Sequence, residues 1–236
     1  MTIPRWHYAA AENNRRMFSR IAHRYDLLNR VMTLGRDGAW RQAAAVLAAP
    51  KGCRLALDMA TGTGELAFAL ASRAEQVVAV DISPQMLSIA RAKARGKPRA
   101  DRIQFVLADG LRLPFAADTF DCIATGFALR NVVDLGLALA EMHRVVRPGG
   151  PVVCLELTRS PSRLLANLHA LCLAALIPAL GRWLAGEASA YRFLSTSLRQ
   201  FPDARQLARA MRDRGFRRVG YRLDRLWPIA LHVGIK

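Results

Sequence analysis

Cysteine is scarce in this chain of 236 residues, which contains only four. They are Cys53, Cys122, Cys154 and Cys172, and no two of them form a Cys-x-x-Cys pair. Most lie in apolar stretches, where a free thiol behaves as a small hydrophobic side chain. We therefore expect reduced core cysteines in a cytoplasmic protein, and no group of histidine, cysteine and carboxylate with the spacing of a metal site.

We also expect neither a secretory leader nor a membrane-spanning helix. The N-terminal residues contain no apolar core of a signal peptide. The most apolar segment, residues 164–185, is interrupted by Asn167, His169, Pro178 and Arg182. Its uncharged part is shorter than the roughly 20 residues that a spanning helix needs. We expect a cytoplasmic protein in which this segment forms a buried or interfacial helix pair.

Acidic residues are outnumbered, with 18 Asp plus Glu against 35 Lys plus Arg and a formal net charge of +17. Such an excess favours anionic partners, either nucleic acid or a membrane surface rich in acidic lipid. Only four of these cations are lysines, so the coding bias of the genome explains the charge equally well. The 52% hydrophobic content is enough for a proper core and argues against disorder.

Apolar segments alternate with helical stretches along the chain. The expected strands are 53–59, 76–80, 103–108, 119–125 and 152–157, and the expected helices are 11–25, 36–48, one from near residue 64, one from residue 84, 134–146 and 203–214. Ser83 is a typical N-cap, and Pro84 is a typical first helical residue. This alternation predicts a doubly wound, Rossmann-like α/β fold with a mostly parallel sheet, which binds its ligand at the carboxyl ends of the strands.

Two further segments are expected to complete this fold. Helices should fill residues 164–198 as an insertion before the last two strands. Residues 216–223 and 227–236 could then close the sheet as a hairpin-like pair.

The first expected strand ends in the residues LDMATGTG, at positions 57–64. Gly62, Gly64 and Ala67 match the G-x-G-x-x-A pattern, and Asp81 follows 17 residues after Gly64, so a dinucleotide also suits the pattern. A nucleoside-triphosphate phosphate loop is excluded because no lysine follows the glycines.

Asp58 distinguishes the remaining ligands. Its carboxylate would crowd a pyrophosphate, but it would attract the ammonium and sulfonium groups of S-adenosylmethionine (SAM). Gly62 and Gly64 would let the backbone approach the methionine part of SAM, where Thr63 offers a hydroxyl and an N–H. The sequence therefore favours SAM over a dinucleotide.

Two more acids follow the next two expected strands. Asp81 would chelate the ribose diol, and Asp109 would pair with the adenine amino group. Helix capping and turn formation are the alternative for either acid alone. With Asp58, however, three acids end three successive strands, and this regularity favours a ligand site.

The sequence resembles the ubiquinone/menaquinone biosynthesis C-methyltransferases over nearly its whole length. The matching stretches are residues 17–41, 57–67, 78–90, 113–132, 145–150, 190–216 and 230–236. The motifs YDLLN at 25–29, LRN at 129–131 and SxRxFP at 197–202 are particular to this family, whereas the glycine loop is shared with methyltransferases in general.

This resemblance implies a class I SAM-dependent enzyme with a seven-stranded sheet. It implies SAM contacts from Thr63, Asp81, Asp109 with Gly110, and Gly126, and it places Tyr25 on an N-terminal lid with Asp26. The family usually has Asn-Ala at positions 109–110 and Ser at 126. Because of these differences, the resemblance does not specify which quinone is the substrate. The expected single domain, 1–236, comprises a lid (1–50), a SAM-binding core (51–158), a helical insertion facing substrate and membrane (159–202) and a C-terminal part (203–236).

Methyl transfer to a ring carbon needs a phenolate that pushes electron density onto that carbon, and it needs no metal. Arg130 is the expected catalytic cation that stabilises the phenolate, with Asn131 orienting the ring. The alternative is an Arg130 that pairs with a nearby acid. The expected substrate is a demethylated prenyl hydroquinone, whose tail requires peripheral contact with an anionic membrane surface, with or without a homodimer.

Three other functions remain as alternatives. A nucleic-acid methyltransferase would use the positive charge, but no NPPY-like tetrapeptide, Pro-Cys pair or RNA-binding module is visible, so no nucleic-acid partner is expected. A different phenolic substrate would keep the chemistry. A non-catalytic protein that binds SAM or a quinone is disfavoured by the complete set of Asp58, Gly62, Gly64 and Asp81.

Overall fold

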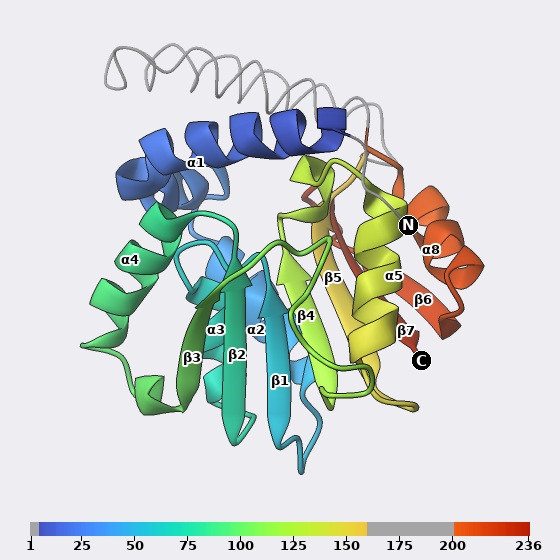
Figure 1. Ribbon diagram of the computed structural model, residues 1–236. Helices are drawn as coiled ribbons and strands as arrows, with labels where there is room; N and C mark the ends of the chain where they lie inside the picture. Colours follow the sequence, from blue (N-terminus) through green and yellow to red (C-terminus); the bar gives the residue numbers. More distant parts are fainter. Residues whose placement is uncertain (1–4, 160–200) are drawn as a thin grey trace.

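A seven-stranded sheet forms the centre of the computed structural model, which describes residues 5–159 and 201–236 (Figure 1). The strands are β1 (Leu55–Met59), β2 (Gln76–Asp81), β3 (Ile103–Leu107), β4 (Cys122–Gly126), β5 (Pro151–Leu157), β6 (Arg217–Leu223) and β7 (Ile229–Ile235). Their order is β3-β2-β1-β4-β5-β7-β6, and β7 alone in this sheet runs antiparallel to both of its neighbours. The predicted doubly wound fold and the closing pair of strands are confirmed.

Helices cover both faces of the sheet. They are α1 (Arg5–Met32), α2 (Asp37–Ala48), α3 (Glu65–Ala71), α4 (Pro84–Ala94), α5 (Leu135–Val145) and α8 (Ala204–Asp213). One core lies between the sheet and α2 with α3, and includes Trp40 and Leu70. The other lies between the sheet and α5 with α8, and includes Leu139 and Met211. Because side chains alternate along a strand, each of the strands β1 to β5 contributes to both cores.

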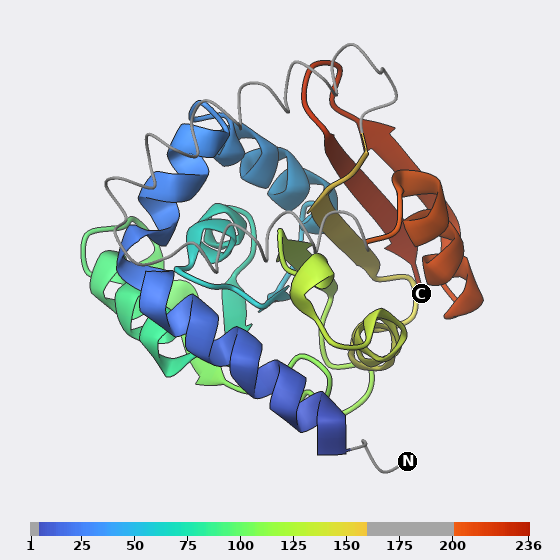
Figure 2. The same ribbon diagram turned by 90° about the horizontal axis from the view of Figure 1, so that it is seen from above.

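Helix α1 passes across the carboxyl ends of the parallel strands, as both views show (Figures 1 and 2). The sequence predicted only residues 11–25 as helical here, whereas α1 has 28 residues. No glycine or proline interrupts the chain between Arg5 and Gly35, so nothing stops the helix earlier. The helix therefore extends well beyond the span predicted from the sequence.

Two expected strands begin later than predicted. Before β1, the backbone N–H groups of Arg54 and Leu55 donate to Oδ2 of Asp121, at 2.6 and 3.1 Å. Cys53 therefore precedes the strand, and β4 begins only at Cys122. Helix starts agree better, since the Ser83 hydroxyl caps α4 by accepting the N–H of Met86 at 3.3 Å.

The described cysteines are free and buried, as expected for core residues. The Sγ atoms of Cys53 and Cys122 lie 3.3 Å apart, a proximity that their separation in sequence did not indicate. Cys172 and the helices expected over residues 164–198 lie outside the described residues. Within the described ranges, no helix has the length and apolarity to cross a bilayer, and no three histidine, cysteine or carboxylate side chains gather as a metal site.

The chain order places a crevice at the ends of β1 and β4. From β1 the chain crosses to β2 on one side, whereas β4 lies on the other side. The loops that follow these two strands therefore diverge, which is where doubly wound sheets bind their ligands. The expected site residues follow β1, β2, β3 and β4, so this edge collects them.

Candidate active site

The loop after β1 combines a buried acid with a tight turn. Asp58 is fully buried, and its Oδ2 accepts the Thr61 hydroxyl at 2.6 Å. Its Oδ1 is buried without a hydrogen-bond partner among the described residues. Burial raises the pKa of Asp58 to about 7. An orphaned carboxylate oxygen of this kind indicates a cationic ligand group beside it.

Glycine is required at the turn itself. Gly62 and Gly64 have φ of +56° and +89°, in the left-handed region. A Cβ atom on Gly64 would lie 3.1 Å from the Phe68 ring and 3.3 Å from the Ala90 Cβ. Both distances are shorter than ordinary van der Waals contacts of a Cβ atom. Near Gly62, by contrast, such an atom would meet only the Tyr25 ring at 4.0 Å. The bare backbone at Gly62 therefore faces open space under α1.

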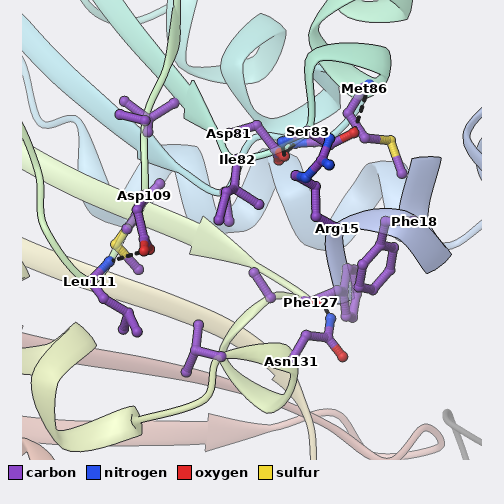
Figure 3. A pocket seen from close by; sticks show the side chains of 18 of the residues that line it. Arg15, Phe18, Asp81, Ile82, Ser83, Met86, Asp109, Leu111, Phe127 and Asn131 are labelled. Carbon is purple, nitrogen blue, oxygen red and sulfur yellow. Dashed lines mark hydrogen bonds between the residues drawn. The ribbon is translucent and has the colours of Figure 1, made fainter. Parts of the chain in front are cut away.

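Asp81 ends β2 and joins two turns. Its Oδ2 accepts the Gly62 N–H at 2.7 Å, and its Oδ1 accepts the Ser83 N–H at 2.8 Å. Burial raises the pKa of Asp81. Asp81 therefore does form turns, which was the alternative to ligand binding considered from the sequence. A carboxylate has about four acceptor positions, however, so it can also bind a diol. Figure 3 shows Asp81 at the wall of a cavity.

Asp109 and its neighbours line the same cavity. Asp109 accepts the Leu111 N–H at 2.9 Å, which makes the turn after β3. An added Cβ would lie 3.4 Å from Met59 at Gly110 and 3.4 Å from Leu66 at Gly126. Both distances are ordinary contacts. The site could therefore accommodate the alanine and serine that the family usually has there.

The cavity of about 130 Å³ beneath α1 brings most of the predicted SAM-contacting residues together. Those in its lining are Tyr25, Gly62, Asp81, Asp109, Gly110 and Gly126, with Asn131 from the predicted catalytic pair. Apolar side chains supply most of the other walls, and Phe18 and Arg15 reach in from α1 (Figure 3). Glycine 64 lies outside this lining, as the N-cap of α3.

A second cavity of about 20 Å³ lies beyond Gly62. Its walls include Asp58 and Thr63, which were also predicted to contact SAM, so of the predicted residues Gly64 alone lines neither cavity. The two cavities share Tyr25, Ala60, Gly62 and Gly126 in their linings. One ligand of two parts can therefore extend from the larger cavity into the smaller one.

Helix α1 is held down over the glycine loop by a polar latch. Asp26 accepts the Thr63 hydroxyl at 2.5 Å through Oδ1, and the ammonium of Lys93 at 2.7 Å through Oδ2. Lys93 also pairs with Glu65 at the start of α3. We call Asp26, Thr63, Lys93 and Glu65 the α1 latch. It fastens the helix that carries Tyr25 to the loop and to α4, in the position of the predicted lid.

Arg130 is paired with an acid, which is the alternative considered from the sequence. Its Nη1 donates to Glu156 on β5, at 3.2 Å from Oε2 and 3.4 Å from Oε1. The two side chains are 7% and 1% exposed. Burial raises the pKa of Glu156, against the opposing effect of the guanidinium. Asn131 lines the larger cavity, whereas Arg130 is not among the described lining residues of either cavity.

Several residues of the site were missed in the sequence. Glu156 lies in an otherwise apolar strand, and an acid in such a strand is a signal of a buried partner. Arg41 of α2 and Phe127 line the cavities without any local motif that indicates this. Phe18 was visible only as one apolar residue of an amphipathic helix.

The arrangement fits SAM. Asp58 can face the ammonium and sulfonium groups, Asp81 the ribose, and the apolar cavity between Ile82, Met86 and Leu111 the adenine. The loop of residues 60–64 contains no lysine or arginine to meet a pyrophosphate. The charge of Asp58 thus disfavours a dinucleotide in the folded protein, as it did in the sequence.

Comparisons with known proteins agree with this geometry. The model of the ubiE/COQ5 methyltransferase family matches residues 8–236. A protein named demethylmenaquinone methyltransferase from Roseiflexus castenholzii is 44% identical over 228 residues, which is 96% of this chain and 94% of that protein. The ubiquinone/menaquinone biosynthesis C-methyltransferase UbiE of Paracoccus denitrificans is 38% identical over 93% of this chain and 89% of its own length.

Solved structures support the fold. A SAM-dependent methyltransferase from Thermotoga maritima has a TM-score of 0.66 at 18% identity, covering 94% of this chain and 99% of its own. A Haemonchus contortus phosphoethanolamine N-methyltransferase bound to S-adenosylhomocysteine has a TM-score of 0.59 at 14% identity, covering 83% and 52%. The sequence, the site and these similarities agree that the chain is a SAM-dependent methyltransferase, and it belongs to the ubiE/COQ5 methyltransferase family.

Proposed function

We propose that this protein transfers the methyl group of SAM to a ring carbon of a demethylated prenyl hydroquinone, with demethylmenaquinol as the first candidate. The observation that carries the proposal is similarity at 44% identity, over nearly the full length of both chains, to a protein named demethylmenaquinone methyltransferase. A ubiquinone precursor is the related candidate, because other relatives are named for both quinones.

The residues of the site take complementary roles in this proposal. SAM supplies an electrophilic methyl group when bound. Asp58 and the backbone at Gly62 hold its methionine part, Thr63 supports that loop, Asp81 takes the ribose and Asp109 the adenine. Tyr25 covers the site from α1, which excludes water from the reacting groups.

The ring would be activated at the end of β4. Glu156 fixes the Arg130 guanidinium, whose Nε is buried without a hydrogen-bond partner among the described residues. Arg130 would stabilise the phenolate that forms when a ring hydroxyl loses its proton, and Asn131 would orient the ring. The carbon must lie about 3 to 3.5 Å from the methyl group for in-line attack.

The substrate also bears on domain organisation and location. We place the whole chain, 1–236, in one class I methyltransferase domain with the subdivisions expected from the sequence. A prenyl tail lies in the bilayer, so the proposed enzyme works in the cytoplasm with peripheral contact at the anionic inner face of the membrane. The formal charge of +17 supports such contact.

The test is incubation of the purified protein with SAM carrying a ¹³C-labelled methyl group and a panel of acceptors. The panel contains demethylmenaquinol, a demethylated ubiquinol precursor, a simple phenol and tRNA. We expect a carbon-bound label on a hydroquinone ring by NMR, and no product with Asp81→Ala. A label mainly on oxygen or nitrogen, or on the simple phenol alone, would overturn the proposal.

A further inference from the structure

Arg41 is a buried cation beside the glycine loop. It projects from α2 into the smaller cavity, whose lining also contains Asp58, Thr61 and Gly62. Its residue is only 7% exposed. One nitrogen, Nη1, donates to Asp37 at 2.7 Å, and the guanidinium lies 5.3 Å from the centre of the Phe127 ring.

Ordinary helix chemistry does not account for this placement. Pairs such as Asp37 and Arg41, four residues apart on a helix, are common on exposed surfaces, where both charges keep their water. Here both side chains are largely withdrawn from solvent, at 16% and 9% exposed. A guanidinium carries five N–H donors, and a single contact with Asp37 leaves a strongly donating group at the cavity wall.

The smaller cavity is lined by one cation, Arg41, and two acids, Asp58 and Glu65, whereas the larger one is mostly apolar. Glu65 is paired with Lys93, and the positive charge of Arg41 acts on the Asp58 carboxyl. A ligand part with an ammonium and a carboxylate on the same carbon would be matched there. The α-amino acid of SAM carries such a pair, an ammonium and a carboxylate. The shared linings connect this cavity to the place proposed for the adenosine part.

We infer that Arg41 binds the carboxylate of the methionine part of SAM, opposite Asp58, which receives the ammonium. The inference rests on SAM as the methyl donor in the proposed function, and it is independent of the acceptor. It assigns α2 a part in cofactor recognition, because a planar guanidinium can bind a carboxylate through two parallel hydrogen bonds.

The sharpest test compares two ligands that differ by this carboxylate alone, SAM and decarboxylated SAM. Isothermal titration calorimetry would measure the Kd of each for the unaltered protein and for Arg41→Gln. We expect the unaltered protein to prefer SAM by about 10- to 100-fold, the effect of one charge-assisted contact. Arg41→Gln should lose that preference, weakening SAM binding while leaving decarboxylated SAM nearly unchanged.

Two further variants serve as controls. Arg209→Gln removes the same charge from an exposed position on α8, and it should keep the full preference for SAM. Arg41→Lys retains a cation without the planar fork, and it should keep part of the preference. Thermal unfolding of each variant shows whether the fold survives.

The outcomes separate the inference from the proposed function. Equal losses for both ligands in Arg41→Gln would overturn the inference, because Arg41 would then only support the loop. If Arg41→Gln does not fold, equal affinities of the unaltered protein for both ligands would overturn it instead. Neither result bears on the proposal that a quinol is the methyl acceptor. If the unaltered protein did not bind SAM, the assignment of SAM as the methyl donor would be wrong, and both proposals would be overturned.

Discussion

Arg130 and Glu156 form a buried ion pair where β4 and β5 end, with 3.2 Å between Nη1 and Oε2. The 25 residues between them in the sequence include α5, and the parallel pairing of β4 with β5 brings them together. Such a pair contributes little net stability, because desolvation of both charges offsets their attraction. Removal of one partner alone is strongly destabilising.

Arg130→Met should therefore lower the free energy of unfolding by about 3 kcal/mol at neutral pH, because Glu156 stays buried without its cation. The pKa of Glu156 would rise further above its unfolded value, so this loss should grow as pH increases. Urea unfolding at several pH values measures it.

The double variant Arg130→Met with Glu156→Gln separates stability from catalysis. It should recover most of the lost stability, because no buried charge remains. Labelled methyl transfer should stay at least about 100-fold below that of the unaltered protein, the usual effect of losing a donor that stabilises developing charge. Recovery of transfer together with stability would show that Arg130 has no catalytic part.

Asp58 should make stability depend on pH. Burial raises its pKa in the folded protein to about 7, from an ordinary value of 3.8. Between these two pH values the folded protein binds more protons than the unfolded chain, so the contribution of Asp58 to stability falls as pH rises and is fully lost above pH 7. Asp58→Asn should remove this slope. The free energy of unfolding of the variant minus that of the unaltered protein should therefore be larger at pH 8 than at pH 4, by about 4 kcal/mol at most.

The comparison requires chemical unfolding of both proteins at each pH, so that all other titrating groups cancel. An identical pH slope in the two proteins would mean that the Asp58 carboxyl is not desolvated in solution.

Adding a side chain at Gly64 should destabilise the protein, whereas adding one at Gly126 should have little effect on stability. Gly64→Ala places a Cβ near Phe68 and Ala90 at a φ of +89°, and should destabilise the protein by about 1 to 2 kcal/mol. Gly126→Ser meets only ordinary contacts with Leu66 and Leu155 and should change stability by less than about 0.5 kcal/mol. Thermal unfolding checks both variants. A Gly126→Ser variant as unstable as Gly64→Ala would contradict the closer packing at Gly64 than at Gly126.

The α1 latch should control how often α1 opens. Lys93→Met removes the cation between Asp26 and Glu65, so hydrogen exchange in α1 should become about two- to fivefold faster. S-adenosylhomocysteine should slow it again by filling the cavity. Lys97→Met is the matched control, because this exposed lysine lies over Phe68 and belongs to no contact of the latch. Equal acceleration in both variants would show that the latch does not hold the helix.

The sequence predicted those features that depend on neighbouring residues. Ser83 and Pro84 indicate the start of α4. Asp58 and Asp81 lie at the carboxyl ends of β1 and β2, and Asp109 follows β3, so the ligand-binding edge could be located from the alternation of elements and the residues at their ends. SAM and the methyltransferase class were also predicted correctly, and the family confirms them.

The missed features depend on contacts between distant segments. The partnership of Arg130 with Glu156 arises only when β4 and β5 pair, and Arg41 lines the same cavity as Asp58 only because α2 packs against the sheet. The full reach of α1 was missed for a different reason, since a helix without caps or breakers has no local end to detect.

Strand β6, one of the two edge strands of the described sheet, bears on how molecules of this protein meet. It pairs with β7 on one side, and its other side is the border of the described sheet. Arg217, Arg218 and Arg222 are exposed along it. An open border with bare backbone groups would otherwise recruit a second molecule and extend the sheet toward fibres. Repulsion between these guanidinium groups on two molecules disfavours such pairing, so this part of the positive charge lies where it opposes edge-to-edge association.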